Sequence, residues 1–199
     1  MSNETSAIPV IASIEDTSHP RRDFLKKGGV FGLATIALGL VNVQPGWART
    51  VSSSEAGDAR ILNVALGLEF EAIAAYGVGA KSGLLKGQAL KLALQFRGQH
   101  RAHAEALQGA IRGMGARAVS PKPVKDYRFP VDTLHNQADV LRFAAGLEKA
   151  AAMAYLGTVP EFHNRGLAKT AASIMGDETM HWAVLRDALG ENPVPISFI

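Results

Sequence analysis

Cysteine is missing from the whole 199-residue chain. Its absence excludes disulfide bonds, metal sites built on thiolates, iron–sulfur clusters and a rubredoxin-type iron centre. An electron relay built on cysteines within the chain is excluded with them. The absence leaves open whether the protein works in a reducing or an oxidising compartment.

Clustered positive charge is also missing, although the chain is basic overall. The formal net charge at pH 7 is +3, and the isoelectric point is near 9.3. The Lys and Arg residues are spread along the chain, and no basic run alternates with aromatic residues. Because nucleic-acid-binding proteins concentrate positive charge on one face, we expect no nucleic-acid partner and a solvated basic surface.

The N-terminal segment has the pattern of a targeting signal. Arg21 and Arg22 are followed by Asp-Phe-Leu-Lys and then by an apolar run at residues 28–43. This pattern resembles a twin-arginine export signal, with Pro20 in place of the usual Ser or Thr. Gly46 and Ala48 are small residues at the two positions that a signal peptidase reads. An uncleaved membrane anchor is the alternative, although the apolar run is near the short end for spanning a bilayer.

We favour cleavage after Ala48 and predict two parts, a twin-arginine signal peptide at residues 1–48 and a mature domain at residues 49–199. The resemblance implies the twin-arginine export machinery as a partner, a periplasmic location and no stable membrane anchor after cleavage. This route exports proteins that are already folded, often with a metal or cofactor loaded inside the cell.

The mature part has the apolar periodicity of four helices and no convincing strand. Capping residues and helix breakers predict the helix bounds. The first helix runs from a cap at Ser52–Ser54 or Asp58 to about Gly79, and the second from about residue 84 to 113. The third runs from about 134 to 159 with Asp132 or Thr133 as its cap, and the fourth from 165 to 189, before Gly190 and Pro193. The connection at residues 115–133 is long and contains three prolines. A long middle crossover is typical of ferritin-like bundles, although any four-helix protein can carry a long loop.

An internal repeat sharpens this prediction. Residues 67–76 and 146–155 share Gly, Leu, Glu and Tyr at an offset of 79, and residues 100–107 share His and Leu with 178–185 at an offset of 78. Two nearly equal offsets indicate a duplicated helical hairpin. Glu69 and Glu148 are thus equivalent, and each has a Tyr seven residues later, on the same helix face.

The other two helices each carry a pair of ligand types three residues apart, and such pairs lie on one helix face. The pairs are His100 with His103, and Glu178 with His181. Ile174 and Leu185 flank the second pair on the same stripe, which predicts an inward-facing site. The candidate metal ligands are Glu69, His100, His103, Glu148, Glu178 and His181, with Tyr76 and Tyr155 as core residues or hydrogen-bond partners of a ligand.

One Glu from each of two helices and a Glu-x-x-His from each of the others is the di-iron or di-manganese carboxylate arrangement. On these motifs the chain resembles the ferritin-like superfamily, which includes ferritin, bacterioferritin, rubrerythrin and manganese catalase. The ending at residues 189–198 is similar to the tail of exported ferritin-like proteins related to desiccation-associated proteins. The resemblance implies an all-α, ferritin-like four-helix bundle with a long crossover between helices 2 and 3, and two Fe or Mn ions.

The same resemblance implies the role of each ligand. Glu69 and Glu148 would be terminal ligands and Glu178 a bridge between the metals. His103 and His181 would supply nitrogen ligands.

His100 departs from the family pattern, which has Glu at this place, usually as a bridge. Three carboxylates with two divalent ions leave a net charge of +1 that a hydroxide or another anion would balance. One alternative is a site with a single metal, and another is a site that holds Zn, Cu or Fe, which accept imidazole ligands. His100 can also simply hydrogen-bond a ligand. The other polar and aromatic residues near the motifs are expected outside the site: Glu71 and Glu105 off the ligand face, Asp177 solvated, Trp182 in packing, His135 and His163 exposed.

Two functions follow as expectations from the resemblance. The first is an exported di-metal protein that handles dioxygen, peroxide or ferrous iron, and that needs an external electron donor unless it follows a catalase-like cycle. The second is a non-catalytic, stress- or desiccation-associated structural bundle with a weak or remodelled metal site. Pairing into a homodimer is implied by the resemblance alone.

Overall fold

The computed structural model describes residues 52–199, and the predicted signal peptide at residues 1–48 lies outside the described residues. The described part is helical and contains no strand, which confirms the all-α prediction. Four long helices are joined by turns and three 3₁₀ segments: α2 Ser53–Lys81, α3 Gly87–Gly113, η1 Val124–Asp126, η2 Val131–Thr133, α4 Gln137–Thr158, η3 Val159–Glu161 and α5 Arg165–Ala188.

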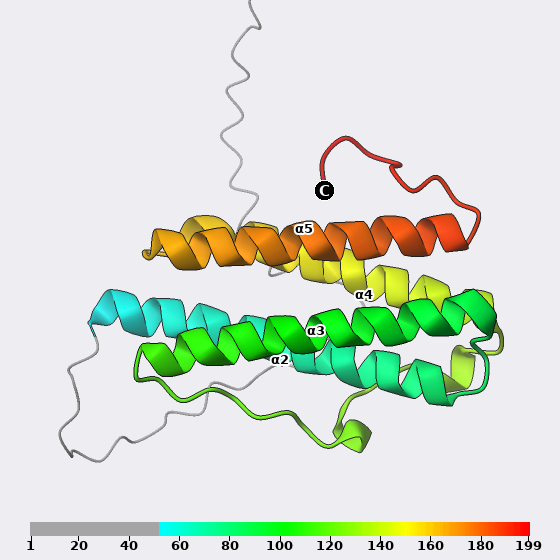
Figure 1. The fold of residues 1–199 in the computed structure, drawn as a ribbon, viewed down its shortest axis with the longest axis horizontal. Coiled ribbons are helices and arrows are strands. Elements are labelled where there is room, and N and C mark those ends of the chain that lie inside the picture. Colours follow the sequence, from blue (N-terminus) through cyan, green and yellow to red (C-terminus); the bar gives the residue numbers. More distant parts are fainter. Residues whose placement is uncertain (1–51) are drawn as a thin grey trace, which may run out of the picture. The chain divides into compact units, whose positions relative to one another are not determined.

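The helices form two hairpins, α2 with α3 and α4 with α5, which pack on each other as a four-helix bundle (Figure 1). The crossover between α3 and α4 runs back along the length of the bundle, so these two helices point in the same direction. This arrangement confirms the predicted bundle with a long connection between its second and third helices.

Ser52 is the N-cap of α2, and Asp58, the other predicted cap, binds the segment before α5 instead. The Ser52 hydroxyl accepts a hydrogen bond from the backbone N–H of Glu55, whose side chain accepts from the Ser52 N–H, which completes a capping box. Asp58 lies inside the helix with 2% of its surface exposed. Its carboxylate accepts the backbone N–H groups of His163 and Asn164, both at 2.9 Å.

Three other helix boundaries differ from the prediction. The helix α2 continues to Lys81, and α3 begins at Gly87 rather than near residue 84, because Leu85 is buried in the core of the turn. The predicted caps Asp132 and Thr133 are wrong, since they lie in η2, and the side chain of Asn136 caps α4 instead. The predicted start of α5 is confirmed, and Gly190 follows its end with a φ of 73°.

Two apolar clusters divide the core along the bundle axis. One contains Tyr76, Phe96, Leu141 and Leu185 among its buried residues. The other is built from residues at the opposite ends of the same helices: Leu62, Ala65, Leu66, Ala104, Leu107, Ile111, Tyr155, Ala171 and Ile174. On each helix the predicted ligand positions fall between these two sets, so the middle of the bundle is polar and has an apolar layer on either side.

One described helix, α2, is long and apolar enough to cross a membrane by length and composition alone. It also carries the buried carboxylates of Asp58 and Glu69, and it packs against α3 and α4. Its apolar character is therefore accounted for by its place in the bundle core.

Candidate metal centre

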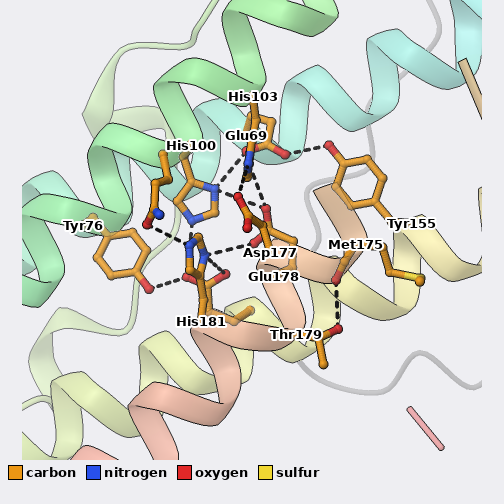
Figure 2. A network of polar contacts seen from close by, with 12 residues as sticks. Glu69, Tyr76, His100, His103, Tyr155, Met175, Asp177, Glu178, Thr179 and His181 are labelled. Atoms are coloured by element: carbon orange, nitrogen blue, oxygen red, sulfur yellow. Dashed lines mark hydrogen bonds and ion pairs between the residues drawn. The ribbon is translucent and has the colours of Figure 1, made fainter. Parts of the chain in front are cut away.

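All six predicted ligand residues meet in the middle of the bundle, and Figure 2 labels five of them, all but Glu148. They come from the four different long helices, and the spacing of three residues in α3 and α5 turns both members of each pair inward. None of them has more than 9% of its surface exposed, and His100 and Glu178 have none. Six ionisable side chains are thus removed from water at one place, which is costly unless they are paired or hold an ion.

The first group consists of Glu69, His100, His103 and Glu178. The Nδ1 atom of His103 lies 3.1 Å from Glu178 Oε1 and 3.5 Å from Glu69 Oε2. The Nδ1 atom of His100 lies 2.8 Å from Glu69 Oε2 and 3.6 Å from Glu178 Oε1. One donor atom from each residue lies within 4.8 Å of all the others, which is close enough for one metal ion.

The second group consists of His100, Glu148, Glu178 and His181, and its donor atoms also lie within 4.8 Å of one another. The Nδ1 atom of His181 lies 3.4 Å from Glu148 Oε2 and 3.5 Å from Glu178 Oε2. The Nε2 atom of His100 lies 3.2 Å from Glu148 Oε1. The two groups therefore share His100 and Glu178, and the two nitrogens of His100 face Glu69 and Glu148 respectively.

Unpaired buried atoms show that the donor set fits a cation. Both carboxylate oxygens of Glu178 and the Nδ1 atom of His103 are buried and have no hydrogen-bond partner of good geometry. An unsatisfied buried polar atom costs about 1–3 kcal/mol. A cation between the glutamates and the histidines would satisfy all three atoms at once. Carboxylate and imidazole ligands together suit Fe, Mn or Zn.

The short distances between the histidines and the glutamates shift the pKa values of both. Burial alone would lower the pKa of His100, but hydrogen bonds to Glu148 and Glu69 and the nearby negative charges raise that pKa to about 11. The pKa of His103 is raised to about 10, since Glu178 and Glu69 outweigh its burial. The protein without metal therefore holds these rings as imidazolium ions at neutral pH, and a metal ion must displace their protons.

The three glutamates differ in their proton affinity. Burial raises the pKa of Glu69 and Glu148, but hydrogen bonds from the histidines outweigh it and bring both pKa values below the usual range. At Glu178 burial dominates and the pKa is raised. The difference agrees with the contacts, because only Glu178 lacks a well-formed hydrogen bond.

Two tyrosines donate hydrogen bonds to Glu69 and Glu148 in a crossed pattern. The Tyr155 hydroxyl of α4 donates to Glu69 Oε1 of α2 at 2.6 Å, and the Tyr76 hydroxyl of α2 donates to Glu148 Oε1 of α4. Burial and the adjacent carboxylates raise the pKa of both phenols above the ordinary value of 10.0. Both phenols therefore remain neutral donors. The sequence placed each Tyr on the face of its own glutamate, and the structure pairs it with the other one.

Two outer partners of the histidines were missed by the sequence analysis. Asp177 was expected to be solvated, which is wrong, because its Oδ2 lies 3.0 Å from His103 Nε2 with the side chain 34% exposed (Figure 2). Gln99 Oε1 lies 3.0 Å from His181 Nε2. The repeat contained the signal, because Gln99 and Asp177 stand directly before His100 and Glu178 at the same offset of 78. Both partners accept the Nε2–H, so the Nδ1 of each histidine faces the carboxylates.

The remaining expectations about neighbouring residues are confirmed. Trp182 is buried in the apolar cluster, and His135 and His163 are exposed. Neither Glu71 nor Glu105 belongs to either group.

Comparison with known proteins agrees with the fold. A family model described as a ferritin-like domain matches residues 57–191. Among solved structures, a conserved hypothetical protein from Mycobacterium tuberculosis is similar, with 22% sequence identity, a TM-score of 0.62, and coverage of 74% of this chain and 100% of that chain. At this identity the likeness shows the fold alone. Among curated proteins none matches this chain.

Proposed function

The chain belongs to the ferritin-like domain family, and from this premise we propose that it is a di-metal carboxylate protein that handles dioxygen, peroxide or ferrous iron. The observation that carries the proposal is the pair of buried four-residue groups that share His100 and Glu178. Two such groups side by side match the two metal positions of the family's bundle site.

Each residue has a role that follows from its contacts. Glu69 and His103 would hold one ion, and Glu148 and His181 the other. Glu178 would serve both, since its Oε1 lies nearest His103 and its Oε2 nearest His181 among the histidines that flank it. Two ions of Fe or Mn would supply electrons to the oxidant by changing their oxidation state.

His100 would take the central place that a second shared carboxylate has in the family. Its Nδ1 is turned to Glu69 and its Nε2 to Glu148, so the neutral ring would bind an ion through one nitrogen and donate a hydrogen bond to the opposite glutamate through the other. With only three carboxylates the pair of divalent ions keeps a charge of +1. A bound anion would balance that charge, and Zn or Cu are the metals that a remodelled site would favour.

The surrounding residues would keep the site dry and the carboxylates fixed. The apolar clusters on either side exclude water, which strengthens every charge interaction in the centre. The hydroxyls of Tyr76 and Tyr155 occupy one oxygen of Glu148 and Glu69, which leaves the second oxygen of each carboxylate for an ion.

We also propose export through the twin-arginine route to the periplasm, on the strength of Arg21, Arg22 and the small residues before position 49. A folded, metal-loaded domain is the kind of cargo that this route carries. Pairing of the exported domain into a homodimer is a further proposal that rests on the family resemblance alone.

The first test is elemental analysis of mature protein purified from its own exported compartment. About two Fe or Mn ions per chain are expected if both groups are filled. About one Zn or Cu per chain would indicate a site remodelled around His100. Mature protein without any metal would overturn the proposal and favour the structural bundle.

The second test separates catalysis from mere binding. The double variant Glu69→Gln, Glu178→Gln removes a terminal and the shared carboxylate, so metal content and peroxide turnover should both be lost. The variant Glu105→Gln is the matched control, because Glu105 is an exposed carboxylate on α3 outside both groups. Survival of both properties in the double variant would refute the catalytic role.

A further inference from the structure

A cavity of about 320 Å³ lies at the end of the bundle where α2 turns into α3. Side chains from all four helices line it, and the crossover contributes Phe129, Val131 and Leu134. Protein interiors are normally packed without voids of this size. The volume is within the range of small-molecule sites.

The lining is apolar, and its two side-chain hydroxyl groups are already engaged. The Ser82 hydroxyl donates to the Gly79 carbonyl oxygen at 2.7 Å and accepts the Leu84 N–H. The Tyr76 hydroxyl donates to Glu148. The lining contains no charged side chain. A charged ligand would therefore lose its hydration without gaining a partner, whereas a neutral apolar molecule would lose little.

The cavity has a buried floor and an exposed rim. Its floor includes Ala93, Leu141 and Ala144, each with 8% or less of its surface exposed. At the rim Val131 is 49% exposed and Ser82 is exposed as well. A ligand can therefore enter from solvent beside the crossover and reach the floor without an opening of the helix pairs.

One side chain belongs both to the cavity and to the candidate metal centre. Tyr76 lines the cavity, its hydroxyl reaches Glu148, and its ring stacks on His100 with a centroid separation of 5.5 Å. Its other neighbour, Phe96, meets it edge-on at 6.0 Å. A molecule on the cavity floor is thus separated from the cluster by a single aromatic ring.

We propose that this cavity is a binding site for a neutral, apolar small molecule, which it holds against Tyr76 beside the metal centre. A cavity of about 150 Å³ takes up benzene, so the volume here suits a molecule of about twice that bulk, such as a fused two-ring aromatic compound or a ten-carbon chain. The site depends on the packing of the bundle and not on bound metal.

The test measures the binding of 1-aminonaphthalene, a neutral two-ring fluorophore, to the metal-free mature protein. Its emission should shift to the blue and saturate at one molecule per chain. The alcohol 1-decanol should displace it. Decanoate, which has the same chain and a negative charge, should compete at least roughly tenfold more weakly, because its carboxylate finds no partner in the lining.

Two matched variants locate the binding. Ala144→Leu adds three carbons to the cavity floor and should weaken binding by roughly tenfold, because a ligand and the added carbons compete for one space. Ala65→Leu makes the same change at the equivalent place of the repeat, in the other apolar cluster and outside the cavity lining. It should leave the affinity unchanged, with circular dichroism confirming that both variants are folded.

Whether the cavity binds the fluorophore is decided on the metal-free protein. No saturable binding to the wild type, or equal binding to wild type and Ala144→Leu, would overturn the proposal.

If the protein also binds metal, Mn²⁺ in the centre should quench the bound fluorophore and Zn²⁺ should not. Quenching equal for both ions, or by neither, would refute the position beside Tyr76. Failure to bind any metal would overturn the proposed function and leave the fluorophore result intact.

Discussion

At the scale of single residues, the centre is nearly two-fold symmetric, and two residue differences between the repeats break this symmetry. His100 stands where the repeat has Glu178, and Gln99 stands where it has Asp177. The first difference puts an imidazole instead of a carboxylate at one of the two positions, 100 and 178, that both four-residue groups share. The second gives the two outer histidine nitrogens different partners, a carboxylate for His103 and an amide for His181.

Restoring the missing carboxylate should change the metal that the site prefers. The variant His100→Glu recreates Glu-x-x-His on α3, and its four carboxylates would neutralise two divalent ions. We expect a higher content of Mn or Fe relative to Zn after competition at equal concentrations, measured by elemental analysis. His135→Glu is the control, since His135 is exposed and outside both groups. An unchanged metal ratio in His100→Glu would contradict a direct role of position 100.

Asp177 should strengthen metal binding through His103. Its carboxylate accepts the Nε2–H and thereby directs Nδ1 to Glu69 and Glu178. Removal of such an outer partner typically costs 10–100-fold in metal affinity, so Asp177→Ala should weaken Mn²⁺ binding by about that factor in a calorimetric titration.

The control for this prediction is Asp187→Ala, on the exposed face of the same helix. Equal affinities of the two variants would mean that the contact with Asp177 is only structural.

At the scale of elements, Asp58 connects the first helix of the bundle to the start of the last. It is buried in α2 and accepts two backbone N–H groups from the segment before α5. These N–H groups would otherwise lie unpaired beside the first turn of a helix. The contact therefore fixes the entry of α5 onto α2.

Asp58→Ala should lower the free energy of unfolding by about 1–3 kcal/mol, because it leaves these N–H groups without an acceptor. Urea unfolding of the metal-free protein measures the change. Asp58→Asn, which keeps one oxygen acceptor, should lose less. The exposed Asp126, in η1, provides the control, and Asp126→Ala should unfold like the wild type. A loss in Asp58→Ala no larger than in this control would refute the connecting role.

Helix ends were harder to predict than helix interiors, because the ends depend on tertiary contacts. Asn136 and Thr133 are both good caps in sequence, and the choice between them depends on the path of the crossover. Leu85 is drawn out of helical geometry by burial at the turn, where it joins the apolar cluster. Such choices depend on tertiary contacts, which local pattern does not contain.

At the scale of the whole molecule, the stability of the metal-free protein should depend on pH through the buried cluster. The pKa values of His100 and His103 are raised from 6.5 to about 11 and about 10. Their contribution to stability is therefore complete below pH 6.5 and is lost as the pH rises from 6.5 through the raised pKa values of about 10 and about 11. The lowered pKa values of Glu69 and Glu148 act at the other end, since their contribution is present above 4.5 and is lost as the pH falls.

Thermal unfolding in the presence of a chelator should thus give the highest Tm between about pH 4.5 and 6.5, with a steady fall toward pH 10. In the metal-loaded protein the fall should be smaller, because the ion and not a proton holds the histidines. A metal-free Tm that stays constant from pH 6.5 to 10 would contradict the charged cluster.

The sequence by itself determined the class of the fold and the six side chains at its centre. Helical periodicity fixes which face of each helix is buried, and the spacing of three residues puts His100 with His103 and Glu178 with His181 on such faces. The repeat identified Glu69 and Glu148 as equivalent. These features are local or repeated along the chain, and therefore they can be read without coordinates.

Only the tertiary structure decided how the helices meet. It paired each tyrosine with the glutamate of the other hairpin, brought Asp177 to His103, and turned Asp58 from a helix cap into a link to α5. It also left the cavity beside Tyr76. Each of these features depends on distances between helices, which packing sets and which no periodicity along one helix encodes.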